Sequence, residues 1–123
     1  MKAIIWKDGT KTFENKEGEI ITEKNMLENK YTNSNGTSFF GSTIRTTVRR
    51  LKEVIGEVSF EDNTGTDKVN IEWSLTLNNT EPITIYDYME YRKIDEDEYI
   101  TFKIGGNNKY LTSLAKDEIL KLL

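Results

Sequence analysis

One run of nine residues alternates apolar and polar side chains without a break: VNIEWSLTL, at positions 69–77. Successive side chains of a β-strand point to opposite faces of the sheet, so this period of two predicts a strand with one wholly apolar face. Such alternation is typical of an antiparallel sheet that buries one face and turns the other to water or to a partner. The chain is therefore expected to fold around a sheet.

Turn signals divide the rest of the chain into further strands. Asp8-Gly9 lies between two apolar runs and favours the tight turn of a hairpin, which predicts strands at 2–7 and 10–15. A polar stretch at 23–37 predicts a loop. Four more strands are expected, at 19–22, 57–61, 82–87 and 99–104.

Two segments are predicted to be helical. Residues 38–55 have apolar side chains spaced by three and four, at Phe40, Ile44, Val48, Leu51 and Ile55. This spacing predicts one long helix, capped by Thr37 or Ser38 and ended by Gly56. A short helix is expected at 113–123. Because regular βαβ alternation is absent, the predicted fold class is α+β: one domain, 1–123, with a mainly antiparallel sheet of five to six strands and the long helix against one face.

Two residue types are missing from this chain of 123 residues, which contains no cysteine and no histidine. Their absence excludes disulfides, thiolate nucleophiles, Ser-His-Asp triads and zinc sites built on either residue. The net charge of −4 disfavours a broad contact with nucleic acid or an anionic membrane. We expect no catalytic residues, no metal and no cofactor, and a cytosolic protein, since no apolar run is long enough for a membrane span.

Charged side chains form two candidate sites. Arg45, Arg49 and Lys52 follow one another on one face of the predicted long helix, either as a solvated flank or as a stripe that faces an anion. The acidic run at 95–98 is interpreted as a solvated loop, because adjacent carboxylates diverge and do not by themselves form a metal site.

The third candidate is the segment that follows the strand predicted at 99–104. Gly105 and Gly106 allow backbone N–H groups to converge, and Asn107, Asn108 and Lys109 lead into a helix whose N-terminus attracts anions. The segment is therefore either a small anion cradle or a tight turn without a ligand.

Aromatic side chains form the fourth candidate, at Tyr86, Tyr88 and Tyr91. In a strand, Tyr86 and Tyr88 point to the same side, away from the main core. Rings on that side either cover a subunit interface or stack on a base. With Arg92 and Lys109 nearby, they would form a pocket for a nucleotide-like anion.

Three stretches resemble a group of small phage proteins: Trp73 in a strand, Thr84-Ile85-Tyr86-Asp87-Tyr88, and Ile104-Gly105-Gly106 before the last helix. This group includes the phage Thoeris anti-defence sponges, which capture cyclic ADP-ribose isomers without degrading them. The resemblance covers about residues 70–123. It implies a homodimer or larger assembly in the host bacterial cytosol, with ligand pockets near the subunit interface.

The resemblance also implies which residues bind the ligand. An aromatic ring would contact adenine, and polar or cationic side chains would contact the pyrophosphate. The matching positions are Pro82, Ile83, Arg92 and Lys109; proline cannot stack as a ring does, and lysine replaces an arginine fork by a point charge. Sequestration without cleavage is therefore the expected function. The alternative is an anti-CRISPR-like inhibitor that binds a defence effector through the acidic carboxy-terminal half, and an enzyme ranks last.

Overall fold

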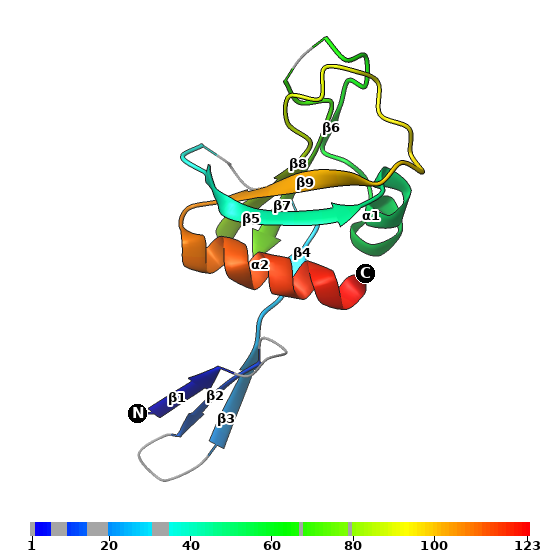
Figure 1. The fold of residues 1–123 in the computed structure, drawn as a ribbon. Helices are drawn as coiled ribbons and strands as arrows, with labels where there is room; N and C mark the ends of the chain where they lie inside the picture. The colour runs from blue at the N-terminus through cyan, green and yellow to red at the C-terminus, as the bar shows by residue number, and fades with distance from the viewer. Residues whose placement is uncertain (1, 6–9, 15–19, 31–34, 67, 79) are drawn as a thin grey trace.

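The computed structural model describes residues 2–5, 10–14, 20–30, 35–66, 68–78 and 80–123. It confirms an α+β fold with a mainly antiparallel sheet of six strands and two helices (Figure 1). The elements in chain order are β1 (Lys2–Ile5), β2 (Thr10–Glu14), β3 (Ile20–Lys24), β4 (Leu27–Glu28), β5 (Ser38–Thr46), α1 (Val48–Ile55), β6 (Phe60–Glu61), β7 (Ile71–Leu77), β8 (Glu81–Tyr86), β9 (Ile100–Gly106) and α2 (Lys109–Leu122).

The main sheet has the strand order β4-β7-β8-β9-β5, and β6 pairs with β7 beside this path. All its pairings are antiparallel. β7, the strand with regular alternation, lies inside the sheet, while β5 forms an outer edge although it precedes β7 in the chain. α2 packs on β5, β9 and β8. The face opposite this helix carries the polar side chains of the same strands.

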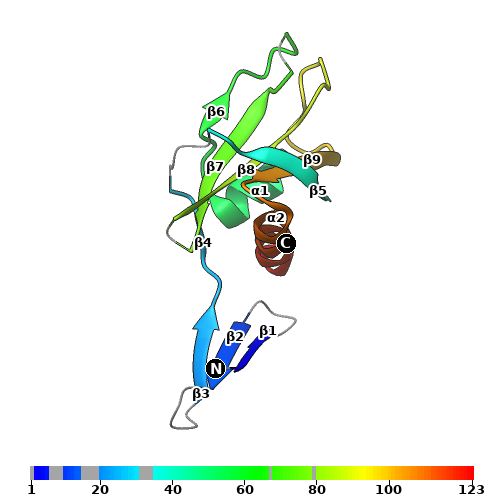
Figure 2. The same ribbon diagram turned by 90° about the vertical axis from the view of Figure 1, so that its left-hand side faces the viewer.

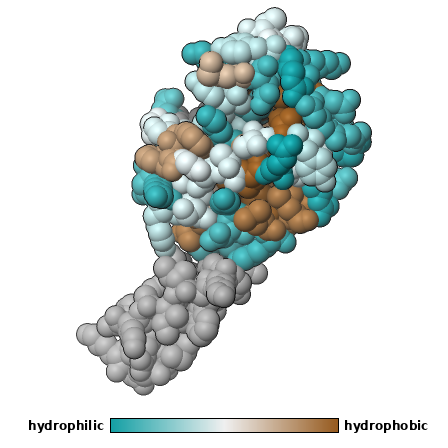
Figure 3. Space-filling view, in the orientation of Figure 1, coloured by the Kyte–Doolittle hydropathy of each residue, from teal (hydrophilic) through white to brown (hydrophobic). Residues whose placement is uncertain are grey.

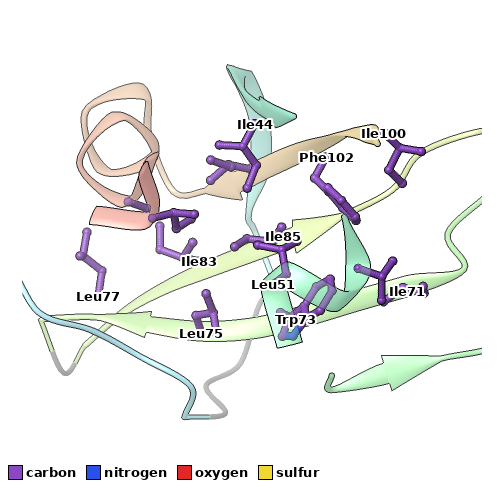
Figure 4. Close-up of a cluster of buried hydrophobic side chains, with 14 of the residues drawn as sticks. Ile44, Leu51, Ile71, Trp73, Leu75, Leu77, Ile83, Ile85, Ile100 and Phe102 are labelled. Carbon is purple, nitrogen blue, oxygen red and sulfur yellow. The ribbon is translucent and has the colours of Figure 1, made fainter. Parts of the chain in front are cut away.

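The core lies between the sheet and the two helices (Figure 4). Trp73 is fully buried, meets the edge of Phe102 at 6.0 Å between ring centroids, and donates its indole N–H to the carbonyl oxygen of Gly56 at 3.0 Å. Val48 and Leu51 bury the inner face of α1 against the same cluster. The apolar face of β7 is thus confirmed as core. The opposite face was expected in water or against a partner, yet Ser74 and Thr76 on it are buried as well.

The prediction of one long helix at 38–55 is wrong in its first half, which forms β5. Ile44 and Thr46 are buried and Arg45 between them is exposed, the period of a strand. β-branched residues at 43, 44 and 46 favour a strand, and pairing with β9 decides the outcome. The helix starts after Thr47, whose side chain accepts a hydrogen bond from the Arg50 N–H, so neither Thr37 nor Ser38 is the cap. Gly56 does end the helix, at φ 93°.

Gly105 and Gly106 were expected to follow the strand, in an anion cradle or a tight turn, but they are the last residues of β9. The last helix starts earlier than expected, at Lys109, and the Asn108 side chain caps it by accepting a hydrogen bond from the Leu111 N–H. Among the described residues, no helix combines the length and apolar character needed to cross a membrane.

The first three strands form a separate antiparallel sheet, in the order β1-β2-β3. The predicted hairpin is confirmed by the pairing of Lys2 with Glu14 and of Ile5 with Lys11, while Asp8-Gly9 lies outside the described residues. The loop predicted at 23–37 is interrupted by the end of β3 and by β4. Figures 1 and 2 both show the small sheet standing off the main body. One domain for the whole chain stays a prediction.

Candidate functional site

The polar face of the main sheet holds a group of rings around one lysine. Tyr86 on β8 pairs with Lys103 on β9, and β9 also pairs with β5, where Phe39 lies opposite Gly105. The Lys103 ammonium lies 4.4 Å from the centroid of the Phe39 ring and 4.5 Å from that of the Tyr88 ring. We call Phe39, Tyr86, Tyr88 and Lys103 the aromatic cluster.

The rings of the aromatic cluster are accessible to a ligand. Phe39 is 41% exposed and Tyr88 is 38% exposed, while Tyr86 meets Tyr88 edge to face with ring centroids 6.2 Å apart. Aromatic faces can stack on a planar ring of a ligand, and an ammonium held between them can contact an anionic group of the same ligand. The aromatic cluster therefore offers both elements needed for a nucleotide-like molecule.

Burial raises the pKa values of two neighbouring side chains, Tyr86 in the aromatic cluster and Glu72 on the adjacent strand. It raises the pKa of the Glu72 carboxyl, which lies on β7 opposite Tyr86. Burial also raises the pKa of the Tyr86 phenol, and the nearby Glu72 and Tyr88 raise it further. Tyr86 therefore keeps its proton at neutral pH and can donate a hydrogen bond to a ligand.

A buried polar network holds the loop that carries Tyr88. The Asp87 carboxylate accepts hydrogen bonds from the backbone N–H groups of Asn70 and Ile71, at 2.8 and 2.9 Å, and from the Asn70 side chain at 2.9 Å. The Asn70 side chain also donates to the carbonyl oxygen of Arg92. Met89 and Tyr91 have φ of 58° and 49°, left-handed values that cost about 1 kcal/mol each outside glycine. The network thus fixes a strained loop and the position of the Tyr88 ring.

Of the other predicted aromatic and cationic residues, neither Tyr91 nor Arg92 joins the aromatic cluster. Tyr91 is exposed on the loop, and its ring takes no part in the described contacts between rings and with Lys103. The Arg92 guanidinium pairs with both oxygens of Glu98 and also lies 3.7 Å from Glu90. These carboxylates, Glu98 first, raise the pKa of Arg92. Arg92 is therefore ion-paired within the chain, and none of the described contacts joins it to the aromatic cluster.

The glycine pair serves packing. A Cβ added to Gly105 would lie 2.5 Å from the Thr84 hydroxyl, and one added to Gly106 would lie 2.9 Å from the Thr112 methyl group on α2. Both glycines are buried. They allow β8, β9 and α2 to approach closely, which accounts for them without a ligand.

The remaining predicted residues of the carboxy-terminal half are spread over three environments. Ile83 is fully buried in the core, and Pro82 is buried in β8. Asn107 is exposed, with its amide 3.5 Å from Glu81. Asn108 is occupied as the helix cap, and the exposed Lys109 is the first residue of α2. The structure therefore does not bring Lys109 and the tyrosines together within the described contacts.

Two of the three cations predicted to share a helix face, Arg49 and Lys52, form ion pairs with the acidic run at 95–98. Arg49 pairs with Asp97 at 2.6 Å and with Glu96 at 3.6 Å, and Lys52 pairs with Glu96 at 2.8 Å. The Glu96 carbonyl oxygen also accepts the Arg49 N–H in the first turn of α1. The acidic run is thus the ionic partner of α1 and not merely a solvated loop. Arg45 lies apart from these pairs on β5 and lines, with Arg49, Arg50 and Tyr99, a cavity of about 490 Å³.

Acid should weaken these ion pairs. Hydrogen bonds from Lys52, Arg49 and Arg92 lower the pKa values of Glu96, Asp97 and Glu98 respectively. Because the folded pKa lies below the unfolded one, this stabilisation is present above about pH 4.5 and is lost as the pH falls through the folded values. We expect Arg49→Gln to melt below the wild type at pH 7, and the difference to shrink at pH 3 and in 1 M salt.

Differential scanning calorimetry at the two pH values measures this prediction. Lys109→Gln, which removes an exposed charge from the first turn of α2, is the control and should change the melting temperature equally little at both. A difference for Arg49→Gln that is as large at pH 3 as at pH 7 would contradict the ionic role of the acidic run.

Phe39 and Lys103 were missed by the sequence analysis. Lys103 could have been found from the alternation Thr101, Lys103, Gly105, which places it on the polar side of a strand whose other side is Phe102 and Ile104. Phe39 could not, because its segment was assigned to a helix. Among the described residues, no group of three metal-ligating side chains comes together. No family model, curated protein or solved structure matches the chain.

Proposed function

We propose that the chain binds a nucleotide-type anion at the aromatic cluster and releases it unaltered. One observation carries this proposal: the Lys103 ammonium on β9 lies between two exposed rings, Phe39 on β5 and Tyr88 on the loop that follows β8. An adenine-like ring would stack on an exposed aromatic face, and a phosphate would contact Lys103. Capture of a cyclic ADP-ribose isomer, which the resemblance to the phage sponges implies, is part of the same proposal.

The alternative, inhibition of a defence effector through acidic charge, has less support. The residues that make the carboxy-terminal half acidic include the run at 95–98, and three of its carboxylates are paired with Arg49, Lys52 and Arg92. A paired carboxylate has less attraction left for a basic partner than an isolated one.

Isothermal titration calorimetry with cyclic ADP-ribose isomers, ADP-ribose and AMP tests the proposal. At least one of these ligands should bind with micromolar or tighter affinity, about −8 kcal/mol or better. Lys103→Gln and Tyr88→Ala should each weaken that binding about tenfold, because each removes one of the two contact types.

Two variants serve as controls. Tyr110→Ala removes a ring of similar exposure on α2 and should leave the affinity unchanged. Lys109→Gln tests the position expected from the sequence, and we expect no effect there either. Chromatography of ligand released by heating should return the starting compound. Absence of heat with every probe, or the appearance of a cleavage product, would overturn the proposal.

A further inference from the structure

Three side chains form a row across the polar face of the main sheet. Glu72 on β7 lies directly opposite Tyr86 on β8, and Tyr86 lies directly opposite Lys103 on β9. Residues paired across antiparallel strands point to the same face, and neighbouring strands lie about 5 Å apart. The cross-strand row therefore holds a carboxyl, a ring and an ammonium in that order, with about 10 Å between the backbones at its two ends.

The carboxyl at one end of the cross-strand row has no partner among the described residues. Burial alone raises the pKa of Glu72, whereas hydrogen bonds from cations lower the pKa values of the carboxyls at 96–98. Glu72 is half-buried between Phe60 on β6 and Tyr86 on β8. A poorly hydrated carboxyl without a donor costs free energy, and a donor group on a ligand would offset that cost.

The two sides of the main sheet differ in what they offer a ligand. α2 packs on one side, and Figure 3 shows brown apolar surface over this helix on the lower part of the main body. The cross-strand row lies on the other side, together with the exposed rings of Phe39 and Tyr88. This second side matches a ligand that combines a planar ring, a hydrogen-bond donor and an anionic group.

We propose that Glu72 selects the base of the bound nucleotide by accepting a hydrogen bond from an exocyclic amino group, such as the 6-amino group of adenine. This rests on the proposed function, because the phosphate must lie at Lys103. A base that stacks on the Tyr88 ring, which meets Tyr86 edge to face, then has its far edge toward Glu72. A nucleotide is long enough to reach both ends of the cross-strand row.

Calorimetry with two nucleotides that differ in one group tests this role. AMP carries the 6-amino group, and purine riboside 5′-monophosphate has a hydrogen atom in its place. The wild type should bind AMP about tenfold more tightly, the effect of one hydrogen bond to a carboxylate. Glu72→Leu removes the acceptor and should bind both nucleotides alike. Glu72→Gln keeps one acceptor oxygen and should retain part of the preference.

A control and a second ligand pair keep the result specific. Glu81→Leu replaces another half-buried carboxyl, at the opposite end of β8 from Tyr86, and should leave the preference for AMP unchanged. Because Glu72 has no described partner, Glu72→Leu should melt no lower than the wild type, which circular dichroism checks. Where only ADP-ribose binds, ADP-ribose and its counterpart without the amino group replace the two nucleotides.

The outcomes separate this role of Glu72 from the proposed function. Equal affinity of the wild type for the two ligands of a pair would overturn the role and leave nucleotide binding intact. A preference that Glu72→Leu does not reduce would overturn it too, because another residue would then contact the amino group. Absence of heat with every ligand would overturn the proposed function itself, and the role of Glu72 with it.

Discussion

Replacing Asp87 with alanine should lower the free energy of unfolding by about 3–5 kcal/mol. The carboxylate is fully buried and accepts three hydrogen bonds, two from backbone N–H groups and one from the Asn70 amide. Alanine would leave the two backbone N–H groups buried without an acceptor, and the Asn70 amide with only its bond to the Arg92 carbonyl oxygen. Because Asn70 also joins Gly65 and Arg92, the loss should spread to both loops that end at this network.

Urea denaturation followed by circular dichroism measures this change, and a graded series makes it specific. Asp87→Asn should cost less, about 1–2 kcal/mol, because the remaining oxygen can still accept the two backbone bonds while its new amide faces that of Asn70. Asp117→Ala, at an exposed position of α2, should stay within about 0.5 kcal/mol of the wild type. Equal midpoints for Asp87→Ala and the wild type would contradict the structural role of the network.

Gly105→Ala should lower the free energy of unfolding by about 2–3 kcal/mol. The added methyl group would lie 2.5 Å from the hydroxyl oxygen of the buried Thr84 and at ordinary contact distance, 3.5 Å, from the Tyr86 ring. The substitution also distinguishes two roles of the glycine. If Gly105 belonged to an anion cradle, the substitution would lower ligand affinity and leave the free energy of unfolding unchanged. If Gly105 serves packing, the substitution lowers the free energy of unfolding.

A second substitution tests the cause of that loss. Thr84→Ala removes the hydroxyl that the new methyl group would meet, so the double variant should recover at least half of the stability lost by Gly105→Ala. Thr84→Ala alone supplies the reference for this comparison. If the double variant is as unstable as the sum of the single changes predicts, the clash with Thr84 does not explain the glycine.

Local pattern predicted the strands that alternate and the turns that separate them. The run at 69–77 and the Asp8-Gly9 hairpin needed only the period of the side chains and a turn dipeptide, and both strand assignments are confirmed. The same reasoning failed at 38–46, where Phe40, Ile44 and Val48 fit the spacing of a helix. There the competing signal was β-branching, and pairing with a strand more than 50 residues later settled the structure.

The candidate site also combines residues that local pattern predicted correctly with residues that it did not. The tyrosines at 86 and 88 were predicted to share the side of a strand away from the core, and the aromatic cluster contains both. Arg92 and Lys109 were assigned to the site as cations expected close to the rings, and Lys109 also because it follows the glycine pair at the start of a helix. Ion pairing with Glu98 and the position at the start of α2 separate them from it. Charge partners depend on which loops meet, and no local pattern records that.

The sequence by itself determined the α+β class, the apolar face of β7 and the absence of thiol and imidazole chemistry, because each depends on residue type or on spacing within one element. The tertiary structure decided which cations remain available, why two glycines follow one another in β9, and which lysine lies between the rings. Those outcomes depend on contacts between residues far apart in the chain. Burial and close approach in the folded sheet set them, and composition leaves them open.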